Sequence, residues 1–383
     1  MPCYAAGRDS VGGRAPLYRR RLQLVEIDGS MGEGGGQVLR SALTLSLLTG
    51  RSMRIRSIRA GRRKPGLMAQ HLKAVEAASV ISGAKAEGVH GGSTELVFRP
   101  GNLSPGEYRF DIGTAGSTSL VLQAVLLPLA LCGAPSSLAI TGGTHVAWSP
   151  CFHYLSLHWM PCLRLIGLVG ELTLDRAGYY PKGGGRIRAR IAPLSALTPL
   201  KMKERGPLQS VHCLSAVTNL PLSVAERQSW QARTRLEGLG VDVSSEEIRL
   251  PGIGRGTLLL LLGVFAASRC CFYALGERGK SAEGVADEAV EALLGFQKTE
   301  GDVDEYLADQ MLLPLALAPG LSELNTARVS RHLLTNAEVI KTFLPVHIEI
   351  DAPAGRPGLV RIEGCGLDGL RRMRRGGLPL SLR

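Results

Sequence analysis

A succession of predicted strands and helices occurs twice in the first half of this chain and returns near its end. The first copy predicts a strand over 22–28, a helix over 38–48, a strand over 53–58, a helix over 67–82 and a hairpin ending at Phe98. The second copy predicts the same succession over 108–191, so that Ile55 and Ile140 correspond at a spacing of about 85 residues. Supersecondary units repeated at a fixed period indicate one packed architecture built from copies.

A third copy is indicated near the end, after a stretch of different pattern. Its expected elements are a helix over 304–317, a strand over 322–327, a helix over 333–343 and strands over 347–350 and 360–362. The intervening stretch reads as strand, helix, three strands and helix between 211 and 296. Insertions enter repeat proteins at surface loops.

The predicted fold class is α+β, with three tandem β/α repeats, each a small sheet covered by two helices, and an inserted smaller α/β domain. The expected division is a flexible N-terminal extension (1–21), repeats one and two (22–203), the inserted domain (204–300) and repeat three (301–383).

A glycine-rich segment, residues 28–40 with the sequence DGSMGEGGGQVLR, separates the first predicted strand from the first helix. Such an arrangement usually points backbone N–H groups at an anion. The dinucleotide-binding fingerprint would need a glycine at Gln37, and no Gly-Lys-Ser/Thr follows for a phosphate-binding loop. The segment therefore predicts either an anion site of another kind or a helix-capping turn.

The net charge is +12, and lysine supplies only nine of the 45 basic residues. Arginine grips phosphates with two hydrogen bonds, so this bias favours a nucleotide or nucleic-acid partner. An arginine-rich coding composition explains the total charge equally well.

The eight cysteines show no Cys-x-x-Cys spacing, which predicts apolar packing in a reducing compartment. Residues 1–21 lack the apolar core of a signal peptide, and the apolar runs at 120–132 and 258–267 read as buried elements. We therefore expect a cytoplasmic protein without membrane segments, or a nuclear one in a eukaryote.

The turns that follow the middle strand of each copy carry polar side chains. They are residues 59–66 (RAGRRKPG), 142–148 (GGTHVAW) and 330–336 (SRHLLTN). If the copies pack around a common axis, arginines, a glycine turn and a histidine face one another. Arginines beside a histidine suit chemistry at phosphorus, with the imidazole as nucleophile or base.

Several of these segments together resemble the RNA 3′-terminal phosphate cyclase family. The resemblance rests on residues 28–43, on 58–67 with 70–72, on 178–185, on 304–310 and on 332–336, in this order, and it covers about 22–380. Five ordered motifs make it specific, whereas a single glycine loop would be weak evidence.

The resemblance implies an ATP-dependent ligase that converts an RNA 3′-phosphate into a 2′,3′-cyclic phosphodiester. A histidine would attack the α-phosphorus of ATP, releasing pyrophosphate and leaving a histidine–AMP. AMP would then pass to the RNA 3′-phosphate, and the vicinal 2′-hydroxyl would displace it, with the high effective molarity of a neighbouring group.

The resemblance also implies roles for individual residues. His332 matches the nucleophile. The expected nucleotide contacts are Gln123, Tyr306, Leu307, Ala308, Asp309 and Gln310. The expected phosphate and RNA contacts are Arg40, Arg59, Arg62 and Gln70. Glu33 would hold a divalent cation, Mg²⁺ or Mn²⁺, or orient another side chain.

The chain departs from the family pattern where His145 and His153 replace the usual polar or acidic residues. We assign neither a metal. An alternative function is a non-catalytic cyclase-like RNA-binding factor in ribosome assembly; His332 and the segment 306–310 favour the enzyme. Enolpyruvyl transfer on a similar repeated fold has no motif support. The oligomeric state stays open, with a homodimer among the candidates.

Overall fold

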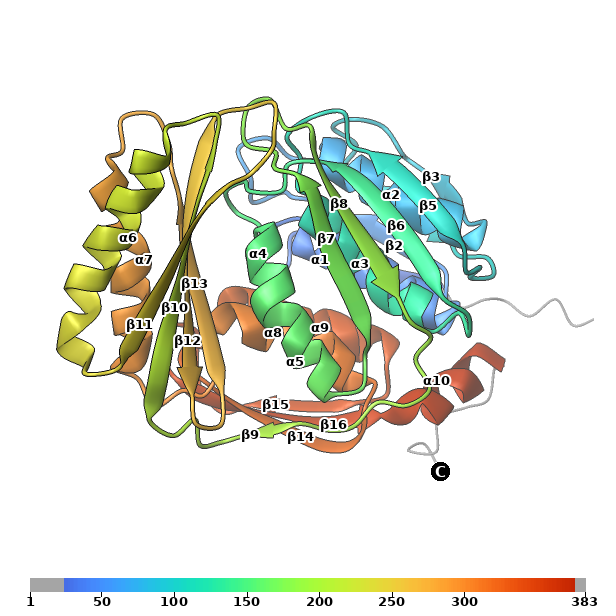
Figure 1. The fold of residues 1–383 in the computed structure, drawn as a ribbon. Helices are drawn as coiled ribbons and strands as arrows, with labels where there is room; N and C mark the ends of the chain where they lie inside the picture. The colour runs from blue at the N-terminus through green and yellow to red at the C-terminus, as the bar shows by residue number, and fades with distance from the viewer. Residues whose placement is uncertain (1–23, 376–383) are drawn as a thin grey trace, which may run out of the picture.

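The computed structural model describes residues 24–375 (Figure 1). The predicted N-terminal extension lies outside these residues. Repeat one comprises β1 (Val25–Asp28), α1 (Gln37–Thr49), β2 (Met53–Arg56), α2 (Ala69–Ser82), β3 (Lys85–Glu87) and β4 (Leu96–Arg99). Repeat two comprises β5 (Glu107–Asp111), α3 (Thr118–Ala130), β6 (Ser136–Gly142), the helical stretch α4 (Phe152–Tyr154), a π-turn (Leu155–Trp159) and α5 (Met160–Leu165), then β7 (Gly170–Arg176) and β8 (Gly185–Ile191).

Repeat three begins with a strand that sequence reasoning missed, β9 (Lys201–Met202). It continues with α8 (Glu305–Ala316), β14 (Pro319–Thr326), α9 (Arg331–Phe343), β15 (His347–Ile350) and β16 (Gly358–Cys365), and α10 (Gly366–Arg375) follows. β9 pairs in parallel with β14 through only two residues, which is too short for a sequence pattern to reveal. The inserted segment therefore lies within repeat three, between its first strand, β9, and its first helix, α8.

The three repeat sheets have one topology. Their strand orders are β1-β2-β4-β3, β5-β6-β8-β7 and β9-β14-β16-β15. In each sheet the first two strands run parallel and the other neighbours antiparallel. Identical order and direction confirm the predicted repeat and the α+β class.

The inserted segment forms a fourth sheet, ordered β11-β10-β12-β13. Its elements are β10 (Leu208–Thr218), α6 (Leu222–Leu236), a 3₁₀ turn (Glu237–Leu239), β11 (Asp242–Arg249), β12 (Gly256–Phe265), β13 (Arg269–Leu275) and α7 (Ala282–Gln297). Helices α6 and α7 cover one face (Figure 1). Along β12, Leu259 and Leu261 pack into the core under these helices, whereas Leu258 and Leu260 pack into the main core. The sheet is therefore buried on both faces, which explains its continuous apolar run. The predicted domain boundaries remain predictions.

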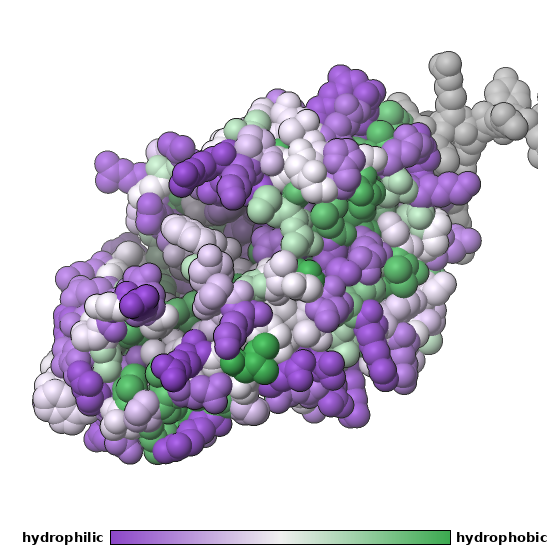
Figure 2. Space-filling view, turned by 90° about the horizontal axis from the view of Figure 1, so that it is seen from above, coloured by the Kyte–Doolittle hydropathy of each residue, from purple (hydrophilic) through white to green (hydrophobic). Residues whose placement is uncertain are grey.

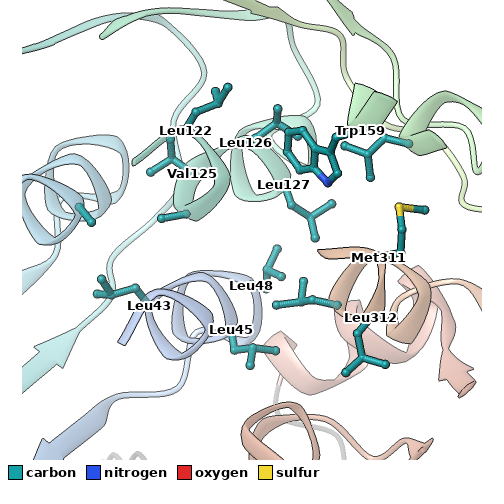
Figure 3. Close-up of a cluster of buried hydrophobic side chains, with 14 of the residues drawn as sticks. Leu43, Leu45, Leu48, Leu122, Val125, Leu126, Leu127, Trp159, Met311 and Leu312 are labelled. Atoms are coloured by element: carbon teal, nitrogen blue, oxygen red, sulfur yellow. The ribbon is translucent and has the colours of Figure 1, made fainter. Parts of the chain in front are cut away.

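The main core lies between the helices of the three repeats. Figure 3 shows leucines of α1 (Leu43, Leu45, Leu48) close to side chains of α3 and α8. Because the central helices pack on one another and not on water, α3 is apolar around almost its whole circumference. Within residues 24–375, no helix is long and apolar enough to cross a membrane.

Candidate active site

The first turns of three helices meet at one end of the main core. Gln37 is the first residue of α1, Asp309 the fifth of α8 and His332 the second of α9. The hydroxyl of Ser330 caps α9 by accepting a hydrogen bond from the Leu333 N–H at 3.1 Å. The cap fixes where α9 begins and so holds His332 toward α1.

The His332 ring is held by two acceptors from repeat one. Its Nδ1 hydrogen bonds to Oε1 of Gln37, and its Nε2 lies 3.1 Å from a carboxylate oxygen of Glu33. The same Glu33 oxygen lies 3.4 Å from Nη2 of Arg62. The His332 side chain keeps 42% of its surface exposed, so a ligand can reach it.

A buried network orients the Gln37 amide. Its Nε2 donates to both carboxylate oxygens of Asp309, at 2.6 and 2.7 Å. The side-chain amide Nδ2 of Asn336 donates to the same carboxylate at 3.0 Å, and the Ser41 hydroxyl donates to the side-chain oxygen Oδ1 of Asn336 at 2.7 Å. A carboxylate only accepts, so the Gln37 amide oxygen must face His332, and Nδ1 carries the proton in that bond.

Burial raises the pKa of Asp309, and the charge of His332 opposes the rise, as do the hydrogen bonds from Asn336 and Gln37. Burial lowers the pKa of Arg40 to about 10, against the attraction of Asp309. Arg40 stays positive near neutral pH although it is half-buried, and so it offers a partly desolvated cation to a phosphate.

Beside Arg40 lies His71, whose pKa burial lowers to about 3, with help from the charges of Arg40 and Arg59. Its Nδ1 accepts a hydrogen bond from the Met68 N–H at 3.1 Å. His71 is therefore neutral near pH 7 and holds the start of α2.

The glycine loop fits closely against its neighbours. Gly32 has φ +60°, and a Cβ there would lie 1.8 Å from the Thr335 hydroxyl of α9. A Cβ at Gly36 would lie 2.3 Å from the His71 ring. Gly36 gives α1 no side-chain cap, so the first N–H groups of α1 stay available to an anion. The glycine loop thus packs closely against Thr335 and His71 and leaves the first N–H groups of α1 without a side-chain acceptor.

A cavity of about 100 Å³ opens between the helices. Its polar lining consists of Gln37, Arg40, Ser41, Thr44, Gln123, Asp309, Gln310 and Asn336. Gln123 of α3 donates to Gln310 of α8 at 2.8 Å across it. The structure therefore brings four predicted site residues, Arg40, Gln123, Asp309 and Gln310, into one lining. Pockets that enclose a ligand usually measure about 300–1,000 Å³, so a nucleotide also needs the open surface beside this one.

The predicted nucleotide segment at the start of α8 divides into exposed and buried residues. Tyr306 is 56% exposed, whereas Leu307 and Ala308 are fully buried in the main core. Asp304 caps α8 through the N–H groups of Tyr306 and Leu307, at 3.0 and 2.9 Å. Without a rearrangement of α8, only Tyr306 of these three presents its side chain to a ligand.

Arg59 and Gln70 are engaged in holding loops. Arg59 has φ +56° and donates to the carbonyls of Lys64 and Gly66, both at 2.8 Å. The side-chain oxygen Oε1 of Gln70 accepts a hydrogen bond from the Ser117 N–H of repeat two at 3.0 Å. Gln70 precedes His71 in α2, and the charge of Arg59 helps to lower the pKa of His71, so both residues lie near His71. Each spends part of its hydrogen-bonding capacity on the protein itself.

Residues 31–350 match the family described as RNA 3′-terminal phosphate cyclase. The chain belongs to this family. It is similar to the RNA 3′-terminal phosphate cyclase of Ralstonia nicotianae, with 46% identity over 86% of this chain and 94% of the relative. The cyclase of Archaeoglobus fulgidus is 45% identical over 84% and 96%, and that of Methylococcus capsulatus 42% over 90% and 97%.

Among solved structures, the enolpyruvyl transferase NikO from Streptomyces tendae overlaps 91% of this chain and 49% of its own, with a TM-score of 0.36 and 12% identity. A likeness this weak carries no inference for a member of the cyclase family.

Glu33 is the carboxylate that the family resemblance proposes for a divalent cation. Within the described residues no group of three His, Cys, Asp or Glu side chains could hold a metal ion by itself. Mg²⁺ often binds through one or two carboxylates together with substrate phosphates, and a single Glu33 fits that mode. Its contacts with His332 and Arg62 also fit the orienting role.

His145 and His153, which the resemblance marks as departures from the family pattern, form a buried pair. Nε2 of His145 lies 2.9 Å from Nδ1 of His153, and its Nδ1 lies 2.7 Å from the Thr144 hydroxyl. Burial lowers the pKa of His153 to about 4 and that of His145 well below its usual value, with His153 adding to the latter shift. The ring of Tyr179 stacks on His145 with centroids 5.2 Å apart. Thus the turn of repeat two contributes a packed, neutral pair where repeats one and three contribute charged side chains.

Sequence reasoning missed Gln37, Ser41 and Asn336 as site residues. Gln37 and Ser41 lie within the resembling segment 28–43, and Asn336 ends the segment 332–336. For α1 the available signal was a polar stripe along an otherwise apolar helix, formed by Gln37, Arg40, Ser41 and Thr44. Gln37 and its partner Asp309 are 272 positions apart in the sequence, and Ser41 and its partner Asn336 are 295 positions apart. No local sequence pattern reveals such pairs.

Proposed function

We propose that this chain is an ATP-dependent RNA 3′-phosphate cyclase with His332 as its nucleophile. Membership of the family and the names of the relatives support the activity and its two substrates, ATP and RNA. The observation that carries the residue assignment is the ring of His332, half exposed and held at Nδ1 by the Gln37 carbonyl. With the proton kept on Nδ1, Nε2 is the nitrogen free to attack phosphorus.

In the first step, Nε2 of His332 forms a bond to the α-phosphorus of ATP, and the bond from that phosphorus to the pyrophosphate oxygen breaks. Glu33, 3.1 Å from Nε2, takes any proton that Nε2 carries before attack. Arg40, Arg62 and the uncapped N–H groups of α1 stabilise the phosphate charge. Tyr306 provides an exposed ring for the adenine, and Gln123 with Gln310 provides polar contacts.

In the second step, an oxygen of the RNA 3′-phosphate takes AMP from His332, which restores the imidazole. The vicinal 2′-hydroxyl then attacks the terminal phosphorus, and AMP leaves as the ring closes. Arg59, Arg62 and Gln70 border the site on the side of repeat one and are the proposed contacts for the RNA end.

We further propose that the reaction uses a divalent cation, Mg²⁺ or Mn²⁺. When bound, it neutralises charge on the phosphates of ATP. Glu33 is the residue that would hold it, with phosphate oxygens and water as the remaining ligands. A cytoplasmic setting and a homodimer are further proposals; light scattering of the purified chain tests the dimer.

The deciding experiment uses ATP labelled in the α-phosphate, with and without the cation. We expect a protein–AMP adduct that is labile in acid and stable in alkali, as a phosphorus–nitrogen bond requires, and that His332→Asn cannot form. An adduct that survives His332→Asn would place the nucleophile elsewhere. No adduct in the unaltered protein would favour the alternative, a cyclase-like factor that binds RNA without catalysis.

A further inference from the structure

Two aromatic side chains at the carboxyl end of the repeat-two sheet lie in water. Trp148, in the turn after β6, is 99% exposed, and Tyr180, in the β7–β8 connection, is 80% exposed. The next residue back, Tyr179, is buried, so the backbone aims one tyrosine inward and the other outward. Trp148 also has φ +63°, a conformation that bulky residues rarely adopt. Exposed rings on a strained backbone are typical of binding sites.

The loops that carry these rings are held together. His145 bridges in parallel to Tyr179, and Ala177 bridges to Gly252 of the insertion. The Asn219 amide donates to the carbonyls of Gly252 and Gly254, both at 2.8 Å. Trp148 and Tyr180 are therefore presented by fixed loops.

The charged side chains within the loops around the rings are basic, and the acidic residue next to them in the sequence is Asp111, at the end of β5. Residues 112–118, 142–149, 177–186 and 250–256 contain no aspartate or glutamate. They contribute three basic side chains, Lys182, Arg186 and Arg255, and none of the three forms an ion pair within the described part of the chain. By contrast, Arg188 and Arg190, further along β8, pair with acidic residues at 2.9 and 3.8 Å. Unneutralised cations beside exposed rings complement a polyanion that also offers flat faces.

This surface, Trp148 with Tyr180, Lys182, Ile253 and Arg255, adjoins the candidate active site. Gln70, the neighbour of His71 in α2, accepts a hydrogen bond from the Ser117 N–H, and Ser117 bridges to Gly143 at the base of the Trp148 turn. The loops lie at the top of Figure 1, and Figure 2 looks down on that end, where hydrophilic side chains predominate and hydrophobic ones form separate patches.

We infer that this surface binds the single-stranded RNA upstream of the reacting 3′-phosphate, with bases stacked on Trp148 and Tyr180 and the backbone near Lys182 and Arg255. The inference rests on the proposed function and adds a second RNA contact, outside the residues that handle the phosphate. Stacking accepts every base, so the surface favours length and single-strandedness in the RNA, without a preferred sequence.

The test compares a 12-nucleotide RNA with a dinucleotide, each carrying a 3′-phosphate, in cyclisation assays at several concentrations. Trp148→Ala combined with Tyr180→Ala should raise KM for the 12-mer by about tenfold for each ring, because base stacking on an aromatic side chain has that size. KM for the dinucleotide should change little. Trp230→Ala is the matched control: Trp230 is 66% exposed on α6 and lies outside these loops.

A second measurement does not depend on turnover. Lys182→Ala with Arg255→Ala should lower the slope of log affinity against log salt by about 0.7 for each charge, measured by anisotropy with a labelled 12-mer ending in a 3′-hydroxyl. Melting temperatures identify any variant that fails to fold.

The outcomes separate the two proposals. No adduct from ATP alone in the unaltered protein would contradict the proposed function. Normal adduct formation with equal 12-mer KM in the aromatic variant and in Trp230→Ala would overturn the RNA surface. A dimer that becomes a monomer in the aromatic variant, with 12-mer affinity retained, would assign the rings to a second copy of the chain and would likewise overturn it.

Discussion

His145 and His332 both follow the middle strand of a repeat, His145 in the connection between β6 and α4 and His332 as the second residue of α9, but their surroundings are opposite. His145 is 1% exposed, and its partners, Thr144, His153 and Tyr179, all belong to its own repeat. His332 has a 42% exposed side chain, and its partners, Glu33 and Gln37, belong to another repeat. The shared topology determines where each histidine lies in its repeat, whereas the residues that surround it determine whether it can react. Contacts within a repeat give a packed imidazole, and contacts between repeats give a reachable and oriented one.

The largest expected effect tests whether only one of these histidines reacts. His332→Asn should reduce the yield of protein–AMP at least about a thousandfold, since a lost covalent nucleophile has no substitute in the site. His145→Asn should still form the adduct at a rate within about tenfold of the unaltered protein, if it folds. Both are measured with labelled ATP on samples whose melting curves have been recorded. Loss of the adduct in folded His145→Asn would make the two turns chemically equivalent after all.

A second prediction concerns the contact that distinguishes His332. Gln37→Met preserves side-chain length but removes the acceptor at Nδ1 and the donor to Asp309. We expect adduct formation to slow by about 10- to 100-fold, corresponding to a hydrogen bond of about 1.5–3 kcal/mol to a charged group. The single-turnover rate against pH is the measurement, because a lost tautomer preference alters the profile as well as its height. Ser41→Ala, at the far end of the same network, should have a smaller effect.

The sequence predicted the order of the strands and helices much better than the environments of the side chains between them. The expected turn over 330–336 is wrong, because α9 begins at Arg331. Hydrophobic periodicity located α1, α3, α9 and the strands of the insertion within a few residues, because each buries a continuous apolar stripe. It missed β9, whose two residues have no period, and α10, whose pattern is largely polar.

The candidate site divides in the same way. His332 and the glycine loop were found by motif. The hydrogen bonds from Gln37 to Asp309 and to His332 could not be found in this way, because they join residues 272 and 295 positions apart. Leu307 and Ala308 were expected at the nucleotide because they stand in the motif, yet their side chains serve the core. A motif reports that a segment matters, and the fold decides which of its atoms face the ligand.

The buried pair of repeat two should make stability depend on pH. The folded-state pKa of His153 is about 4 and that of His145 is also lowered, whereas an unfolded histidine titrates near about 6.5. Between these values the unfolded chain binds more protons, so stability is complete above about pH 6.5 and falls toward pH 4, by up to about 1.4 kcal/mol per pH unit for each histidine. His153→Gln should flatten this slope in denaturant titrations at pH 7, 6 and 5. An equal slope in the variant would mean that other groups dominate acid unfolding.

The smallest expected effect compares the loops that follow the first strands of repeats one and two. Gly32 and Gly113 have similar left-handed backbones, with φ of +60° and +73°, so an alanine at either costs about 1–2 kcal/mol of strain. Only at Gly32 would the added Cβ meet another repeat, 1.8 Å from the Thr335 hydroxyl; at Gly113 nothing lies within 4 Å.

Gly32→Ala should therefore destabilise the protein by about 1–3 kcal/mol more than Gly113→Ala, as overpacked sites do. It should also slow adduct formation, because Thr335 follows His332 by three residues on α9 and so lies on the same side of the helix. Denaturant midpoints and adduct rates for the two variants decide the point. Equal loss of stability with equal adduct rates would show that α9 shifts freely away from the loop, and that the joint between repeats one and three does not hold His332 in place.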